Sequence, residues 1–199
     1  MLAVLVEQRW GPLVRFDRRF DDDLNHHAAA HPSEVRFWRG VSAVLSPAVL
    51  RTALLVVGAW LLYRRYVQPA VLCAVASLGS LALVTAVKDG IDRPRPAVPV
   101  HVASAPGASF PSGHAATAAA AALTVIVLSW PHVGRRWRWV VSVAAGVVAV
   151  AVGFSRLVLG VHYPSDVAGG WFGAPALVFG VVALLRAWPS ISRSRGPSR

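Results

Sequence analysis

The chain has 199 residues, which is room for one domain, and 55% of them are hydrophobic while 15% are charged. A mean hydropathy of +0.53 with so few charges excludes an ordinary soluble domain, in which about 25% of residues are charged. The net charge of +11 does not indicate nucleic-acid binding, because the basic residues are scattered between apolar runs and form no stripe interleaved with aromatic residues.

The first 45 residues (1–45) mix charged residues, histidines and alanines without a wide apolar face. The opening stretch Met1–Val6 is too short to cross a membrane, and it lacks the basic start and the cleavage site of a signal peptide. We therefore expect one or two short helices that lie at the outer membrane interface, with Phe16, Phe20 and Trp38 as anchors.

Five apolar segments follow, each close to the roughly 20 residues that cross a bilayer as a helix. They are Pro47–Tyr63, Pro69–Val87, His114–Trp130, Trp139–Leu159 and Val167–Trp188. Helices are expected because each one satisfies its own backbone hydrogen bonds in hydrocarbon. Arg51 lies near the end of the first segment and can extend toward the interface. The sole cysteine, Cys73, excludes an intrachain disulfide and a cysteine-built zinc site.

The predicted fold is therefore an all-α, polytopic membrane bundle of about five transmembrane helices with short N-terminal interfacial helices. Its membrane-embedded domain is expected over residues 46–190, followed by a basic cytoplasmic tail over 191–199. Arginines gather after the first span, after the third span and in the tail, and the positive-inside rule makes that side cytoplasmic. The Lys88–Pro111 connection and the Gly160–Asp166 turn then lie on the outer face. Arginine in place of lysine, with abundant alanine and valine, indicates a GC-rich bacterial genome, and we therefore expect the membrane to be a bacterial plasma membrane.

The first cluster of chemical interest is the stretch KDGIDRPRP, which begins at Lys88. Lys88 is the only lysine among 20 basic residues, so its place at a membrane boundary indicates a specific use. Lys88 and Arg95 supply fixed positive charge, and arginine offers paired donors that match phosphate oxygens. In a simpler interpretation, Lys88 and Arg93 only anchor a helix end among headgroups. That explains one cation at a boundary, but it explains poorly why three clusters lie on one face.

The second cluster is Pro111-Ser112-Gly113-His114, which precedes an alanine-rich apolar helix. Ser112 is a suitable N-cap, and the amides of Gly113 and His114 would point out of the helix start, where an anion binds readily. A capped alanine helix is a common structural element and is weak evidence alone. His114 strengthens the case, because it can give a proton to a leaving oxygen.

The third cluster is SRLVLGVHYPSD, which ends at Asp166, the only acidic residue in the second half of the chain. Pro164 suits the first turn of a helix and places His162 just before that helix. Asp166, four residues after His162, can accept a hydrogen bond from one imidazole nitrogen and leave the other as a nucleophile. Arg156 adds a third cation. A nucleophile, a proton donor and fixed cations are the parts that phosphate-ester cleavage needs.

These three clusters resemble the signature motifs of the type 2 phosphatidic acid phosphatases, whose superfamily also contains bacterial acid phosphatases and vanadium haloperoxidases. The motifs are Lys, six residues, Arg-Pro; Pro-Ser-Gly-His; and Ser-Arg, five residues, His, three residues, Asp, all present without substitution. The resemblance implies that His162 attacks phosphorus and forms a phosphohistidine, that Asp166 orients it, and that His114 protonates the leaving group. The residues that would hold the phosphoryl oxygens are Lys88, Arg95, Ser112, Gly113 and Arg156.

The resemblance also implies that no metal or other cofactor is needed, which agrees with a site too poor in carboxylates to hold magnesium or calcium. Membrane-bound members commonly have six spans rather than five, and the difference would be N-terminal. Small residues over Ala115–Ala122 and at Gly169, Gly170 and Gly173 would let helices pack closely.

The leading hypothesis is a metal-independent phosphatase that acts on lipid phosphates or diphosphates at the outer membrane face. The alternative is a lipid-binding or anion-binding transporter without hydrolysis, although no internal repeat of the kind found in transporters is evident. A third reading, haloperoxidase activity with bound vanadate, fits poorly with embedding in a membrane. Expected partners are the lipid phosphate substrate and membrane lipids, with no nucleic acid.

Overall fold

The computed structural model describes residues 1–97 and 107–187, and within these ranges the chain is helical, without a strand. The helices are α1 (Leu2–Glu7), α2 (Gly11–Ala30), α3 (Pro32–Val44), α4 (Pro47–Tyr63), α5 (Val67–Ala74), the π-helical turn η1 (Val75–Gly79), α6 (Ser80–Gly90), α7 (Gly113–Ser129), α8 (Arg135–Val158) and α9 (Pro164–Ala187).

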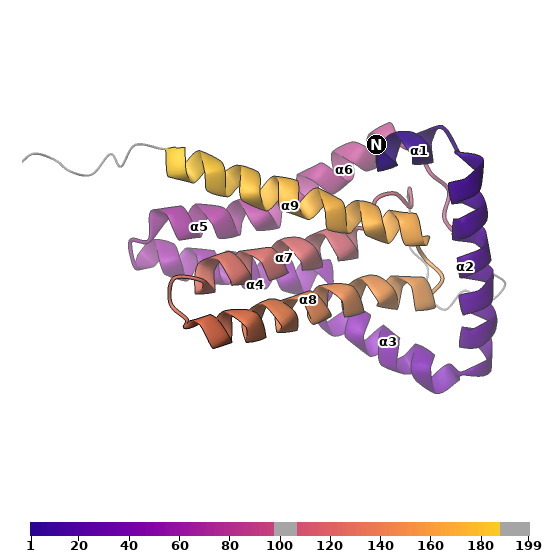
Figure 1. The fold of residues 1–199 in the computed structure, drawn as a ribbon, viewed down its shortest axis with the longest axis horizontal. Helices are drawn as coiled ribbons and strands as arrows, with labels where there is room; N and C mark the ends of the chain where they lie inside the picture. The colour runs from indigo at the N-terminus through magenta and orange to yellow at the C-terminus, as the bar shows by residue number, and fades with distance from the viewer. Residues whose placement is uncertain (98–106, 188–199) are drawn as a thin grey trace, which may run out of the picture.

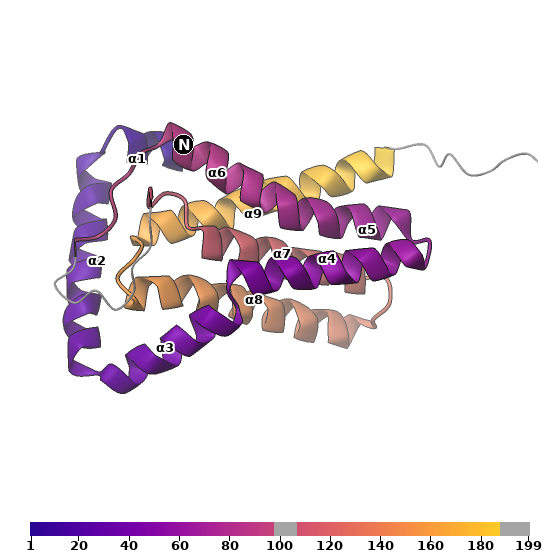
Figure 2. The same cartoon turned by 180° about the vertical axis from the view of Figure 1, so that it is seen from behind.

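Helices α4 to α9 run along the long axis of the molecule, and α2 crosses one end of them (Figures 1 and 2). Helices α5, η1 and α6 follow one another as a single continuous rod. Helix α7 lies at the centre of the bundle and contacts α4, α6, α8 and α9. The starts of α7 and α9 therefore lie at the end that α2 covers.

Four helical stretches are long and apolar enough to cross a membrane, namely Pro32–Tyr63, Val67–Gly90, Arg135–Val158 and Pro164–Ala187. Helix α7 is a shorter apolar helix of 17 residues. The first expected span is α4, which is the second part of the longer stretch Pro32–Tyr63, and each of the other four coincides with a helical stretch within a few residues. The all-α membrane bundle is confirmed. Trp188, the expected end of the last span, and the expected tail at 191–199 lie outside the described residues.

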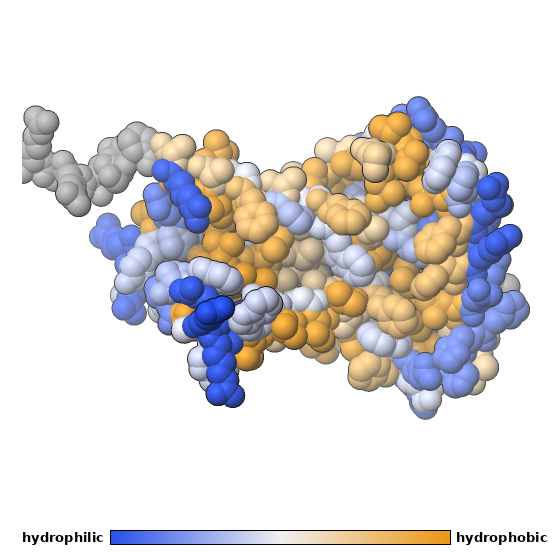
Figure 3. All heavy atoms as spheres, in the orientation of Figure 1, coloured by the Kyte–Doolittle hydropathy of each residue, from blue (hydrophilic) through white to orange (hydrophobic). Residues whose placement is uncertain are grey.

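The surface of the bundle is apolar along most of its length, and polar residues gather over α2 and at the opposite end (Figure 3). Large hydrophobic side chains such as Val147, Phe172, Phe179 and Leu184 point outward and are more than half exposed. Exposed apolar side chains on this scale indicate a surface in contact with lipid. The protein is therefore an integral membrane protein.

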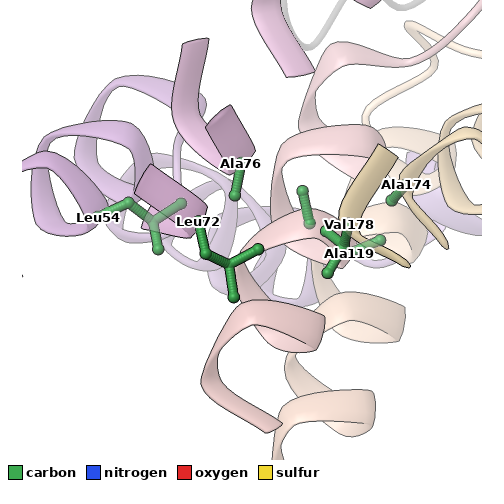
Figure 4. Close-up of a cluster of buried hydrophobic side chains, with 7 residues drawn as sticks. Leu54, Leu72, Ala76, Ala119, Ala174 and Val178 are labelled. Atoms are coloured by element: carbon green, nitrogen blue, oxygen red, sulfur yellow. The ribbon is translucent and has the colours of Figure 1, made fainter. Parts of the chain in front are cut away.

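The bundle core consists of small and medium side chains from α4, α5, η1, α7 and α9 (Figure 4). It comprises Leu54, Leu72, Ala76, Ala119, Ala120, Ala174 and Val178. A side chain added at Gly170 would bring its Cβ within 2.7 Å of the Ser112 carbonyl oxygen and 2.8 Å of the Ala116 amide nitrogen. Glycine at this position lets α9 lie directly on the first turn of α7. The expected close packing of small residues is thus observed where these two helices begin.

The N-terminal segment is only partly as expected. Helix α2 lies across the end of the bundle, and the rings of Phe16 and Phe20 are 6.1 Å apart on it. Helix α3 instead runs into the bundle and packs on α8, with the ring of Trp38 5.0 Å from that of Phe154. The indole of Trp38 thus packs against α8, and its role as an interfacial anchor stays a prediction.

Candidate active site

The three sequence clusters meet at the end of the bundle that α2 covers. They lie at the end of α6, at the start of α7 and in the turn between α8 and α9. Two antiparallel steps in the chain produce this meeting, because α6 and α8 both end where α7 and α9 begin (Figure 1). Residues separated by up to 78 positions therefore surround one space.

The turn between α8 and α9 exposes a short stretch of backbone that carries His162. Gly160 follows the end of α8 with a φ of +65°, a left-handed conformation that glycine adopts at little cost. Pro164 then begins α9, as the sequence predicted, and Asp166 lies in its first turn. This arrangement places His162 one turn before the carboxylate.

His162 is almost fully buried, and its two ring nitrogens face different partners. Nδ1 lies 3.5 Å from Oδ2 of Asp166, which is long for a hydrogen bond. Nε2 lies 3.3 Å from Nη1 of Arg95. Burial, which outweighs the opposing effect of the Asp166 carboxylate, lowers the pKa of His162 to about 4. The imidazole is therefore neutral at pH 7, which is the form that a nucleophile requires.

Asp166 is completely buried and its carboxylate is firmly held. Oδ1 accepts a hydrogen bond from Nη1 of Arg93 at 2.6 Å, and Oδ2 accepts one from the amide of Tyr163 at 2.9 Å. The backbone carbonyl of Asp166 accepts a hydrogen bond from the amide of Ser112 at 2.9 Å. This last contact ties the second cluster to the third.

Ser112 caps α7, as predicted from the sequence. It is fully buried, and its Oγ accepts a long hydrogen bond of 3.5 Å from the amide of Ala115. Gly113 and His114 form the first turn of α7 and are half-buried. His114 lies where the charges of His162, Arg156 and Arg95 all act on its imidazole.

The predicted cations lie around this group, and backbone carbonyls or a side-chain hydroxyl position them. Lys88 donates to the carbonyl of Ala108 at 2.6 Å. Arg95 donates to the carbonyls of Gly107 at 3.0 Å and of Val161 at 2.8 Å. Arg156 is 7% exposed and donates to Oγ of Ser42 on α3 at 2.6 Å.

Three buried side-chain nitrogens in residues 1–97 and 107–187 have no hydrogen-bond partner: Nε of Arg51, Nε of Arg156 and Nδ1 of His162. Unsatisfied buried polar atoms are rare, and each one calls for a physical explanation. Nδ1 of His162 faces Oδ2 of Asp166 at 3.5 Å, whereas Nε of Arg51 and Nε of Arg156 belong to an electropositive group. Such a group is suited to bind an anion, which would accept hydrogen bonds that the protein itself does not accept.

Arg51 is one residue whose role the sequence did not indicate. Instead of extending to the interface, it donates from Nη2 to Oγ1 of Thr117 at 3.1 Å, one turn along α7 from His114. Its charge is among those that act on His114. The expectation for Arg51 was wrong because nothing in the α4 sequence shows which face of that helix meets α7.

Asp17 and Arg93 are two further residues that sequence reasoning missed. Asp17 was expected in an interfacial helix and Arg93 as an anchor at most, yet Nη2 of Arg93 lies 2.7 Å from Oδ2 of Asp17. Ser165 also bonds to both. The only available signal was an acidic residue on the polar helix α2, which is also typical of a solvated surface.

One group of residues in the described part of the chain has ligand atoms close enough to hold a metal ion. It consists of the exposed residues His27, His31 and Glu34 at the corner between α2 and α3. None of these belongs to the group of predicted site residues described above. The expectation that the site needs no metal stays a prediction.

Comparisons with known proteins agree with this geometry. Residues 69–189 match the model of the PAP2 superfamily. The chain is 33% identical over 147 residues to phosphatidylglycerophosphatase B of Bacillus subtilis, covering 72% of this chain and 68% of that protein. It is 38% identical over 63 residues to undecaprenyl-diphosphatase of Sulfolobus acidocaldarius, covering 32% and 27% of the two chains.

A solved structure has the same fold. The crystal structure of a transmembrane PAP2-type phosphatidylglycerolphosphate phosphatase from Bacillus subtilis superposes with a TM-score of 0.79 at 25% identity, covering 96% of this chain and 94% of that one. The match extends beyond the family motifs to the whole helical bundle. The chain therefore belongs to the PAP2 superfamily and is embedded in a membrane.

Proposed function

We propose that the protein hydrolyses phosphate monoesters or diphosphates of membrane lipids through a phosphohistidine on His162, without a metal ion, at the outer face of a bacterial plasma membrane. The observation that carries this proposal is the convergence of a buried neutral imidazole, its carboxylate partner and buried cations with unsatisfied donors. A phosphoryl group supplies the acceptor oxygens that this arrangement requires.

In the first step, Nε2 of His162 attacks phosphorus while the bond between phosphorus and the lipid oxygen breaks. Asp166 faces Nδ1 and orients the ring, so that Nε2, which lies beside Arg95, is the nitrogen available to attack. His114 gives a proton to the lipid oxygen, which leaves as an alcohol or, from a diphosphate, as a monophosphate. Lys88, Arg95 and Arg156, with the amides at the start of α7, stabilise the charge on the phosphoryl oxygens.

In the second step, water attacks the phosphohistidine. His114, now neutral, accepts a proton from this water, the bond between phosphorus and Nε2 breaks, and inorganic phosphate leaves. His162 returns to its neutral form, so the cycle closes without any external redox partner. The buried position of His162 limits attack on the intermediate to water that enters through the site.

Phosphate release from purified full-length protein in detergent micelles tests the activity. The panel contains phosphatidate, phosphatidylglycerol phosphate and undecaprenyl diphosphate, the last two because relatives are named for them. Quenching with ³²P-labelled substrate should leave label on the protein that is stable to base and labile to acid, as a phosphohistidine is. Full phosphate release by His162→Gln would overturn the mechanism.

The outer-face location is supported by the exposed arginines at the opposite end of the bundle, such as Arg64, Arg65 and Arg136. It can be tested in intact cells with a membrane-impermeant maleimide. The native Cys73 is buried and gives little background. Asp92→Cys, near the site, should react in intact cells, and Arg136→Cys should react only after permeabilisation. The reverse pattern would contradict the proposed orientation.

A further inference from the structure

The N-terminal helix α2 contributes one completely buried carboxylate, that of Asp17. Its Oδ1 accepts a hydrogen bond from the amide of Ser165 at 3.0 Å. Its Oδ2 accepts from Oγ of Ser165 at 2.5 Å and from Nη2 of Arg93 at 2.7 Å. An ionised carboxylate is costly to bury unless it is paired and hydrogen-bonded, and this one meets both conditions. Its partners are the first turn of α9 and the loop after α6, which both carry catalytic motifs.

Arg93 joins this carboxylate to the catalytic one. Its Nη2 bonds to Asp17, while its Nη1 bonds to Oδ1 of Asp166 at 2.6 Å and to Oγ of Ser165 at 2.7 Å. The guanidinium also lies over the ring of Tyr163, at 4.4 Å from the ring centroid. Although burial opposes it, the carboxylates of Asp166 and Asp17 raise the pKa of Arg93. Arg93 is thus a fixed cation between two buried anions.

The geometry of Asp166 shows what this bridge does. Arg93 donates to Oδ1, which turns Oδ2 toward His162. The amide of Tyr163 also donates to Oδ2 and helps to fix its position. Arg93 alone would place an additional positive charge beside the nucleophile and draw Asp166 away from it. The negative charge of Asp17 offsets that charge and restrains the far side of the guanidinium.

We infer that Asp17 and Arg93 form a positioning pair that orients the catalytic carboxylate Asp166 toward His162 and balances the charge around it. This makes α2 part of the catalytic unit, although Asp17 precedes the residues that match the family. Neither residue touches the reacting atoms, so both act through Asp166. The inference rests on the proposed function of His162 as nucleophile.

The charge balance predicts opposite effects for the two residues. Removing the negative charge of Asp17 makes the protonated form of His162 less favourable, so the acid limb of the pH profile should move to lower pH. Removing the positive charge of Arg93 should move that limb to higher pH. Because both residues act on His162 from behind Asp166, we expect modest shifts of about 0.5 to 1 pH unit.

The comparison is valid only if the other charged groups that act on His162, or on the residues around it, do not change between the variants. They are Asp166 on α9, Arg156 on α8, His114 on α7, Lys88 on α6, Arg95 in the loop after α6, Arg51 on α4 and Asp21 on α2. Burial first, and then the charges of Asp22, Asp17 and Asp166, raise the pKa of Asp21 to about 6. Asp21 is therefore already neutral at the acid limb near pH 4, and it does not imitate the expected shifts.

The experiment compares full-length Asp17→Asn, Arg93→Gln and the double variant in detergent micelles, with kcat, KM and kcat/KM measured from pH 3.5 to 8 for one lipid phosphate. Asp23→Asn is the matched control, because it removes an exposed carboxylate from the same helix. We expect kcat to fall about 10-fold to 100-fold in each single variant with little change in KM, as for other residues that orient catalytic groups. The acid limbs should move in opposite directions, and the double variant should return the limb toward that of the parent.

A purely structural role would lower the fraction of active protein without moving either limb. Active protein is therefore counted by the amount of phosphoenzyme trapped per chain. Unchanged kcat in Asp17→Asn, or limbs that move in the same direction, would overturn the inference. Full activity in His162→Gln would instead overturn the proposed function, so the two failures are distinguishable.

If Asp17→Asn does not fold, Arg93→Gln and Ser165→Ala replace it. Arg93→Gln must still move the acid limb of the pH profile to higher pH. Ser165→Ala removes the hydroxyl that bonds to both members of the pair but changes no charge. It should lower kcat and leave the limb in place. A normal kcat in Ser165→Ala together with an unmoved limb in Arg93→Gln would refute the inference.

Discussion

Arginines lie at both ends of the bundle, and the two groups differ in what surrounds them. At the end away from α2, Arg64 lies over the ring of Trp60 and Arg138 over that of Trp130, with centroid distances of 5.5 Å and 5.0 Å. At the α2 end, Arg156 is buried and the side chain of Arg93 is only 11% exposed, and both are bonded to side chains from distant helices.

The difference shows that one residue type serves two purposes in a membrane protein. Exposed arginines beside aromatic rings hold a helix end at an interface and set orientation. Burying an arginine costs free energy unless an anion or another hydrogen-bond acceptor pairs with it, so a buried arginine indicates a functional site. Substitutions at the two ends should therefore have very different consequences.

The largest contrast is expected between His162→Gln and Arg136→Gln. Loss of the proposed nucleophile should reduce kcat/KM by about 10⁴-fold or more, since glutamine cannot form the covalent intermediate. Arg136 is exposed at the opposite end, and its replacement should leave kcat/KM unchanged. Phosphate release from equal amounts of phospholipid-reconstituted protein measures both. A decrease in kcat/KM of comparable size in the Arg136 variant would contradict the proposed difference between the two ends of the bundle.

A conservative change sharpens the comparison. Arg156→Lys keeps the charge but loses the planar fork that bonds Ser42 and faces the site, so we expect kcat to fall about 10²-fold to 10³-fold. Arg135→Lys at the exposed end should be neutral, because a charge at an interface needs no particular geometry. Steady-state kinetics on both variants decide the point. Equal activity in the two would mean that Arg156 acts only as a charge.

The pH profile should reflect His162 and not the exposed arginines. Burial lowers the pKa of His162 to about 4, so the nucleophile is neutral above that pH and becomes protonated as the pH falls through it. We therefore expect kcat/KM to fall about tenfold per pH unit below pH 4. Circular dichroism over the same range separates this loss from unfolding. An acid limb near the ordinary histidine pKa would contradict the burial argument.

The two ends of α9 allow a matched test of packing. Gly170→Ala adds a Cβ that would lie 2.7 Å from the carbonyl oxygen of Ser112, so the start of α7 must shift. We expect the free energy of unfolding to fall by about 1–3 kcal/mol. Gly180→Ala adds the same atom where nothing lies within 4 Å, and it should be neutral or slightly stabilising. Thermal unfolding in detergent measures both. Equal unfolding temperatures would show that α9 can move away from α7 without cost.

The smallest effect is expected from metal removal. Dialysis against EDTA should change kcat by less than about twofold, since the cations that face the phosphoryl group are side chains. His27→Ala, which removes a member of the exposed group with metal-ligand spacing, should likewise leave hydrolysis unchanged. A loss of activity on chelation that Mg²⁺ or Zn²⁺ restores would contradict metal-independent catalysis.

The sequence alone determined the helices and the residues at their boundaries. Apolar runs predicted the spans because a helix is the economical backbone structure in hydrocarbon, and Ser112 and Pro164 marked the starts of α7 and α9 by local rules of capping and dihedral preference. The sequence also predicted that Asp166 lies beside His162, because the two residues are four positions apart at the start of one helix.

Only the tertiary structure decided which distant side chains complete that group. Asp17 lies 149 positions before Asp166, and Arg51 meets Thr117 across the interface between two helices. Residues such as these carry no local signal, since a carboxylate on a polar helix and an arginine near a membrane boundary are common on solvated surfaces. Their burial depends on how α2 and α4 pack, which periodicity along a single chain does not specify.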